Sequence, residues 1–202
     1  MQGIGNGPAA GGIIARAKAI VTSPTTEWAR IAGETDAPMQ VFTRYAVPLA
    51  AIGPVAQFVG GQVFGYGALG IRYSPSFTSG LTAAILTYLL SLASLWVVAL
   101  VASKLAPRFG GREDFPAGFR LVAYAMTASW LSGIFGLVPA LSILGLLGLY
   151  SLYLLYKGAA PVMGVPADKA VGFMVVTVLV AIAINIIVGL MAAGIAGTGA
   201  MV

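Results

Sequence analysis

The chain contains no cysteine and no histidine, and charged residues make up only 8% of it. Without cysteine, disulfides and thiol chemistry are excluded. Without histidine, the commonest general base and the commonest metal ligand are missing. Average soluble proteins are about 25% charged, whereas 59% of this chain is hydrophobic. The hydrophobic excess must face lipid, so the composition predicts an integral membrane protein, with no catalytic, metal or cofactor site.

The net charge of +5 comes from 11 basic and 6 acidic residues. Membrane proteins collect Lys and Arg in their cytoplasmic segments. This is our interpretation of the basic excess, and we expect no binding of nucleic acid. Residues 1–12 are rich in glycine and uncharged, which fits a flexible terminus and neither a signal peptide nor a transit peptide.

Four long runs contain no charge: residues 45–71, 73–103, 121–156 and 170–202. A membrane-spanning helix needs about 20 apolar residues, so each run holds at least one crossing. Residues 121–156 are too many for one crossing, and Pro139 lies near their centre, where proline ends one helix and starts the next. The sequence therefore predicts an all-α protein with five transmembrane helices, at roughly 45–65, 79–103, 120–137, 140–156 and 170–194.

The basic residues support this count. With five crossings and the N-terminus inside, ten of the eleven basic residues lie in inner segments and only Arg72 lies outside. Merging residues 121–156 into one helix would leave eight inside and three outside, which fits the positive-inside rule less well. The C-terminus is then outside. A re-entrant hairpin around Pro139 stays open as an alternative to two full crossings, because both of its ends are inside either way.

Two short helices are expected before the first crossing, at residues 13–21 and 24–33. Ser23 is a good N-cap and Pro24 is favoured at the first helical position. Apolar residues gather on one face of each helix, which is typical of helices that lie in the membrane surface. Packing of these helices on the ends of the membrane helices is the alternative. The candidate interfacial residues are Arg16, Lys18 and Trp28.

Polar side chains inside the predicted crossings are candidates for a site. Gln57 and Gln62 flank Gly60-Gly61 in a first helix that also contains Pro54. Transporters build sites at broken helices with polar side chains, but an ordinary kink with hydrogen-bonded amides explains the same pattern. The candidate intramembrane polar residues are Gln57, Gln62, Tyr124 and Asn185.

The last predicted helix has a small or polar residue at every fourth position, including Ala181, Asn185, Gly189 and Ala193. Small residues let two membrane helices approach closely, and an amide can hydrogen-bond across the contact. This seam serves either internal packing or a homodimer. A similar small surface is formed by Ser142, Gly145, Gly148 and Ser151.

The six carboxylates all lie outside the predicted hydrocarbon region. Proton relays and ion-coupled carriers usually carry an intramembrane charge, and none is predicted here. Glu113 and Asp114 form the only adjacent acidic pair, which we interpret as part of a solvated turn.

The chain resembles the bacterial branch of the YIP family, the Ypt/Rab-interacting proteins. The resemblance rests on residues 121–135, 137–141, 148–156 and 165–170, with Ser23-Pro24, Glu27-Trp28 and residues 45–49 upstream. It implies a five-helix protein of the bacterial cytoplasmic membrane with a cytoplasmic N-terminal segment. Eukaryotic members bind small GTPases of the Rab class. Their acidic motif before the first helix is replaced here by Asp36-Ala37-Pro38, which argues against GTPase binding.

The sequence thus divides into a flexible N-terminus (1–12), amphipathic cytoplasmic helices (13–44), a five-helix membrane domain (45–196) and a short tail (197–202). We expect a non-catalytic scaffold or adaptor that acts through protein and lipid contacts. Its expected partners are membrane lipids and a second copy or another membrane protein. The alternative is a channel, carrier or lipid-handling protein with a site near the kinked first helix.

Overall fold

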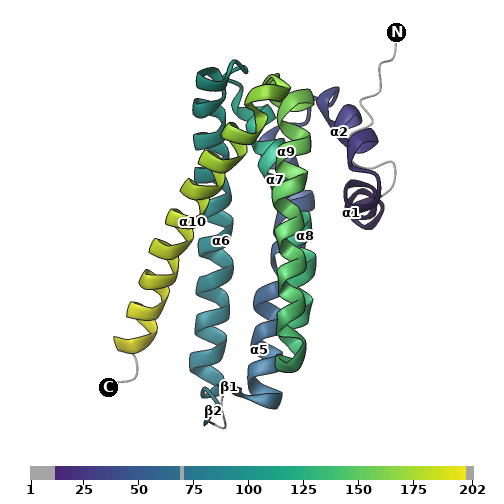
Figure 1. Cartoon of the computed structure of the whole chain (residues 1–202). Helices are drawn as coiled ribbons and strands as arrows, with labels where there is room; N and C mark the ends of the chain where they lie inside the picture. The colour runs from purple at the N-terminus through teal and green to yellow at the C-terminus, as the bar shows by residue number, and fades with distance from the viewer. Residues whose placement is uncertain (1–11, 69–70, 199–202) are drawn as a thin grey trace.

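A computed structural model describes residues 12–68 and 71–198, with side chains described except at 67–73, 188–189 and 191–198. Two short helices, α1 (Gly12–Thr22) and α2 (Pro24–Ala32), begin the chain. They lie beside one half of a bundle of long helices (Figure 1). Both helices were predicted, and their bounds differ from the prediction by at most one residue.

The first membrane stretch is broken around its prolines. It consists of α3 (Pro38–Val41), a π-helical turn η2 (Phe42–Ala46), α4 (Val47–Ala50) and α5 (Ile52–Phe64). The N–H of Val47 reaches the carbonyl of Phe42, five residues back, just before Pro48, because proline cannot donate the next helical bond. A second break at Ala51 precedes Pro54. The kinked first helix is confirmed, but its breaks lie before Gly60-Gly61 and not at it.

A short antiparallel hairpin follows, with strands β1 (Tyr66–Ala68) and β2 (Ile71–Tyr73) paired from Tyr66 to Tyr73. Next come the long helix α6 (Phe77–Leu105) and the turn η3 (Ala106–Phe109). After the turn, the side chain of Asp114 accepts a hydrogen bond from the N–H of Ala117 and caps the next helix. Asp114 therefore lies in a turn, as predicted.

The chain then forms α7 (Phe115–Ala125), α8 (Thr127–Ser132), η4 (Gly133–Leu137), η5 (Pro139–Leu149), α9 (Tyr150–Met163) and α10 (Ala167–Thr198). Val138 is extended, with φ −122° and ψ 113°. The predicted break at Pro139 is confirmed. Both sides of it are 3₁₀-helical, over five residues before the break and eleven after it. This was not predicted, and 3₁₀ runs this long are uncommon.

Four helical stretches are long and apolar enough to cross a membrane: residues 38–64, 77–109, 139–163 and 167–187. Residues 115–137, which contain the third predicted crossing (120–137), are helical except at Met126 but are not among the four. Every residue from Ala117 to Ala125 is buried, because α7 lies between α6 and α9. A helix enclosed by protein has less need of an apolar surface. The described residues thus form an α-helical membrane protein with four candidate spans and one hairpin.

Glycines allow residues 133–137 to pack closely against α5. A Cβ atom on Gly133 would lie 2.7 Å from the Cα of Gly53, and one on Gly60 would lie 2.5 Å from the carbonyl oxygen of Leu137. The two segments therefore descend side by side in almost direct backbone contact. The turn at Pro139 lies at the level of Gly60, about one helical turn before α5 ends.

Candidate functional site

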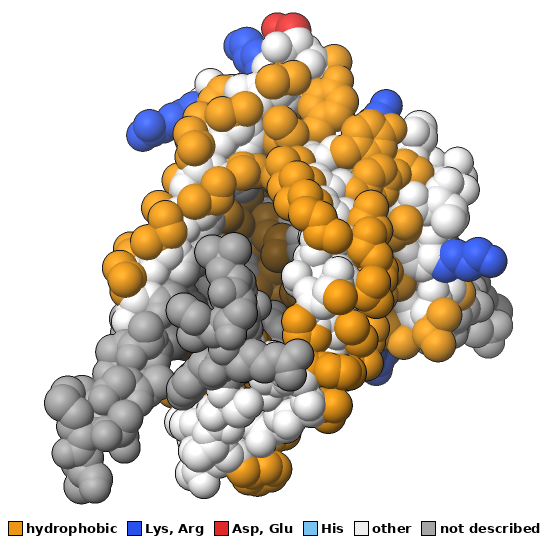
Figure 2. Space-filling view, turned by 60° about the horizontal axis from the view of Figure 1, so that its bottom comes forward, with side chains coloured by type: hydrophobic (Ala, Val, Ile, Leu, Met, Phe, Trp, Pro, Cys, Tyr) orange, Lys and Arg blue, Asp and Glu red, His pale blue; other side chains and the backbone are white. Residues whose placement is uncertain are grey.

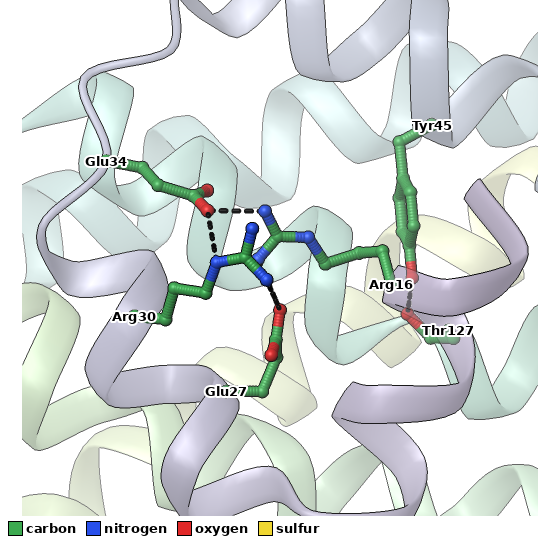
Figure 3. A network of polar contacts seen from close by, with 6 residues as sticks. All are labelled: Arg16, Glu27, Arg30, Glu34, Tyr45 and Thr127. Atoms are coloured by element: carbon green, nitrogen blue, oxygen red, sulfur yellow. Dashed lines mark hydrogen bonds and ion pairs between the residues drawn. The ribbon is translucent and has the colours of Figure 1, made fainter. Parts of the chain in front are cut away.

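A buried ion-pair network joins the two N-terminal helices. The guanidinium of Arg16 on α1 donates to Glu27 on α2 over 2.5 Å, and to Glu34 just beyond it (Figure 3). The side chain of Arg16 is 3% exposed. Arg30 approaches both carboxylates from the solvent side at 3.9 Å. One arginine thus ties α1 to α2 and to the segment that follows α2.

Aromatic residues of the bundle lie directly beneath this network. The guanidinium carbon of Arg16 is 5.2 Å from the centre of the Tyr124 ring on α7, a cation–π contact. Tyr45 of η2 packs edge-on against Tyr124 at 4.7 Å. The hydroxyls of Tyr45 and Thr127 are hydrogen-bonded at 2.7 Å, as Figure 3 shows. The network therefore extends from α1 through α7 to the first membrane stretch.

Three further contacts attach the N-terminal segment to the bundle. The hydroxyl of Tyr150 donates to the carbonyl of Val21, and Arg120 donates to the carbonyl of Asp36. Trp28 is fully buried. A Cβ on Gly158 of α9 would lie 2.8 Å from the Trp28 ring, so glycine is needed there for the indole to fit. Each contact joins residues more than 80 apart in the chain.

Burial alone would lower the pKa of Arg16, but the hydrogen bond to Glu34 and the charges around it outweigh burial and raise the pKa above the usual arginine value. Arg16 therefore stays charged. Buried charges are costly unless paired, and removing one partner of such a pair costs about 3–5 kcal/mol. The network therefore stabilises the docked helices only while Arg16 and both of its glutamate partners, Glu27 and Glu34, are present.

A second feature is a cleft within the bundle, of about 630 Å³. Figure 2 shows it as a hollow with hydrophobic walls, viewed from the hairpin end. Five polar residues line it among many apolar ones: Ser129, Ser132, Ser151, Thr177 and Asn185. The cleft lies between α10 on one side and α6, α7, α8, η5 and α9 on the other. Among the described residues, several polar side chains of the membrane helices thus gather around this cleft.

Most of these polar groups bond within the chain. The hydroxyl of Ser129 lies 3.0 Å from both the carbonyl of Gly148 and the hydroxyl of Ser151. Ser132 donates to the carbonyl of Ser129. The amide of Asn185 donates to the carbonyl of Ala181, one turn earlier. The Thr177 hydroxyl is buried and has no partner.

The structure corrects the interfacial prediction for two residues. Arg16 and Trp28 are buried inside the protein, so they do not face the membrane surface. Both pack on the membrane helices instead, Arg16 because two carboxylates and an aromatic ring surround it. Lys18 alone of the three candidates is exposed.

The predicted polar residues do not form one site. Gln57 and Gln62 are exposed, and Gln62 donates only a long bond of 3.4 Å to the carbonyl of Pro75. Tyr124 is buried under Arg16, and Asn185 lines the cleft. The proposed site at the kinked first helix is therefore not assembled among the described residues.

The predicted seam on the last helix falls partly on the cleft. Ala181 and Asn185 line it, but Asn185 bonds within its own helix and not across a contact. The side-chain surroundings of Gly189 and Ala193 lie outside the described residues. Gly145, Gly148 and Ser151 of the second small surface also line the cleft. The spacing of small residues found this surface, whereas nothing in the sequence singled out Ser129 or Ser132.

Within residues 12–68 and 71–198, no group of three or more acidic residues lies close enough to hold a metal ion. The model of one known family, the Yip1 domain, matches residues 18–192. Neither the curated proteins nor the solved structures that were searched contain a match. The family model covers the end of α1, all of α2 and most of the bundle, so the chain belongs to the Yip1 domain family.

Proposed function

We propose that this protein is a non-catalytic scaffold or adaptor of the bacterial cytoplasmic membrane, with five crossings, a cytoplasmic N-terminus and an external C-terminus. The placing of ten basic residues on one side supports this topology. The depth of the Pro139 turn also supports it. Leu137 lies beside Gly60, so residues 115–137 descend almost as far as α5 does.

The observation that carries the scaffold role is the network centred on Arg16. It holds α1 and α2 in one position on the bundle, through Tyr124 and Trp28. Because α1 and α2 are fixed in position, they give the cytoplasmic end of the bundle a surface of constant shape that a partner could bind. We infer that three exposed basic side chains contribute to it: Lys18 on α1, Arg30 on α2 and Arg44 on η2. Such a surface suits contacts with anionic lipid headgroups and with a protein partner.

Direct binding of a small GTPase is not part of this proposal. The segment that replaces the family's acidic motif is occupied within the chain, because the carbonyl of Asp36 accepts from Arg120 and one carboxylate oxygen of Asp36 is buried. Lipids are partners by necessity, since large hydrophobic residues such as Ile143, Leu146 and Ile186 are exposed along the candidate spans.

The test is chemical cross-linking and mass spectrometry of the protein purified from native membranes. A scaffold predicts a protein cross-linked in constant ratio to residues of α1 and α2, at Lys18 in particular. Replacing Arg16 with Met should release the helices and remove these cross-links, whereas replacing the exposed Arg44 should leave the other cross-links in place. Purification with no protein partner, or cross-links indifferent to Arg16, would refute the proposal.

A second copy of the chain is the partner that the α10 seam suggests. Gly189→Leu should then yield a folded monomer in detergent, while the similar change Ile187→Leu leaves the dimer intact. Equal behaviour of the two variants would remove the homodimer from the proposal.

Lipid handling is the second candidate function, and the intramembrane cleft favours it. A channel or carrier site around Gln57 and Gln62 has no such support, because both side chains lie apart from the other polar groups.

A further inference from the structure

Helix α1 carries an apolar side chain that the rest of the described chain leaves uncovered. Ile14 is 81% exposed, the highest value for a large hydrophobic side chain among the described residues. It also lies outside the four candidate spans. Lys18, one turn further along α1, is exposed as well, whereas Arg16, Ala17 and Ile20 are buried against the protein. One face of α1 is therefore docked, and the other is open.

The lengths of the helices show where the membrane lies relative to α1. The hydrocarbon layer is about 30 Å thick, which is about 20 residues of α-helix. Counted from the hairpin end, this length runs from Phe64 of α5 back to Arg44, and from the start of α6 to Val97. The eleven residues of η5 rise about 22 Å and begin about 6 Å inside the end of α5, so Tyr150 lies about 28 Å from that end. The inner boundary of the hydrocarbon layer therefore lies near Arg44, Val97 and Tyr150.

Helix α1 packs on the bundle at this same level. The hydroxyl of Tyr150 donates to the carbonyl of Val21 at the end of α1. The guanidinium of Arg16 lies over Tyr124, and α1 contacts α8. Figure 1 shows α1 nearer to the hairpin end than α2 is, and turned across the direction of the long helices. This is the orientation of a helix that lies in the membrane surface.

The open face of α1 points away from α2. Arg16 faces α2, because its guanidinium bonds to Glu27 and to Glu34 just beyond that helix. Each residue of an α-helix is turned by about 100° from the one before it, so Ile14 and Lys18 both lie about 160° from Arg16. Since α2 lies on the cytoplasmic side of α1, Ile14 faces the hydrocarbon layer. The long stem of Lys18 allows its amine to reach back to the headgroups.

The ion-pair network also determines the charge of this surface. Glu27 and Glu34 are bonded to Arg16, and their side chains are only 7% and 10% exposed. Lys18 and Arg44 are exposed at the level of the boundary. The surface thus presents cations while these two carboxylates are turned inward. Such a surface is complementary to the negative charge of anionic phospholipids.

We propose that the open face of α1 binds anionic phospholipids of the inner leaflet, with Ile14 among the acyl chains and Lys18 at the phosphates. The depth of α1 selects a lipid as the occupant, because lipid surrounds a membrane protein at this level. The inference deepens the proposed function, on whose cytoplasmic N-terminus it rests. It also gives the network centred on Arg16 a role, which is to keep two carboxylates away from the headgroups.

The first test measures the depth of Ile14 in the full chain, in nanodiscs of phosphatidylcholine and phosphatidylglycerol. The chain has no cysteine, so Ile14→Cys accepts a single spin label. Oxygen, which concentrates in the hydrocarbon layer, should relax this label more than a water-soluble nickel chelate does. The matched control is Thr26→Cys, at an exposed position of α2, where the nickel chelate should act more strongly. Nanodiscs expose both membrane faces, so a wrong topology or a missing protein partner does not affect this result.

The second test measures which lipid lies beside α1. A fluorophore at position 14 is quenched by phosphatidylglycerol or by phosphatidylcholine that carries a nitroxide on its acyl chain, in equal amounts. We expect phosphatidylglycerol to be preferred, and Lys18→Gln to lower the preference about two- to fivefold. Lys169→Gln, at an exposed position of α10, should leave the preference unchanged. Both substitutions are at exposed positions, so loss of folding does not explain a difference between them.

Three results would overturn the proposal. Stronger relaxation of the position-14 label by the nickel chelate would show that this face meets water. Exclusion of both reagents would show that protein covers it, whether a second copy or another chain. Equal quenching by the two lipids, or a preference that Lys18→Gln does not change, would show that α1 does not select anionic phospholipids.

Discussion

Arg16 lies over the ring of Tyr124, with its guanidinium carbon 5.2 Å from the ring centre. The two residues come from the outermost and the most enclosed helices of the protein. A charged side chain from the N-terminal segment is thus buried against the centre of the bundle, where Glu27 and Glu34 balance it. This contact region holds the N-terminal helices together with the separate contacts of Val21, Trp28 and Asp36.

We predict that Arg16→Met destabilises the protein by about 3–5 kcal/mol, because it leaves buried carboxylates without their partner. Thermal unfolding in detergent measures the loss. Lys18→Met, at an exposed position of the same helix, should change stability by less than about 0.5 kcal/mol. Adding Glu27→Gln and Glu34→Gln to Arg16→Met should recover part of the loss. No recovery would show that packing, and not charge, holds the helices.

The helices and the break at Pro139 follow from the local sequence, whereas the ion-pair network around Arg16 does not. Pro139 predicts the break it makes because proline lacks an N–H, and the neutral runs around it predict helices. Burial of Arg16 depends on Glu34 and Tyr124, which approach it only in the folded chain. No local pattern in α1 distinguishes a buried arginine from one that lies on a membrane surface.

The intramembrane cleft could also be predicted only in part, because local sequence does not show which helices meet in the folded chain. Spacing of small residues drew attention to Ala181 and Gly148, but spacing does not say which helix they face. The contact of Gly60 with the backbone at Leu137 was also missed, since Gly60-Gly61 was interpreted as part of a broken or kinked helix and not as a helix crossing.

We predict that Gly60→Ala destabilises the bundle by about 1–3 kcal/mol, the usual cost of overpacking. The new methyl group would lie 2.5 Å from a backbone oxygen, which cannot move as a side chain can. Gly145→Ala is the control, because a Cβ there has no atom within 4 Å. Thermal unfolding of both variants checks the prediction, and equal stability would contradict the close crossing of α5 and η4.

We predict that Gly158→Ala loosens the N-terminal helices, because its methyl group would clash with Trp28 and Leu121. The chain has no cysteine, so a single cysteine at buried Ala17 reports on docking. A thiol reagent should label position 17 slowly in the parent chain and faster with Gly158→Ala. Ala160→Gly, at an exposed position of the same helix, should leave the rate unchanged. A rate that Gly158→Ala does not alter would mean that Trp28 is not held by α9.

The most direct measurement is the sidedness of single cysteines placed at positions 112 and 202 of the full chain, labelled with an impermeant reagent in intact cells and in inverted membranes. Five crossings with an inner N-terminus predict that position 112 reacts only in inverted membranes and position 202 only in intact cells. Labelling of both positions from the same side would contradict five crossings and, with them, the proposed topology.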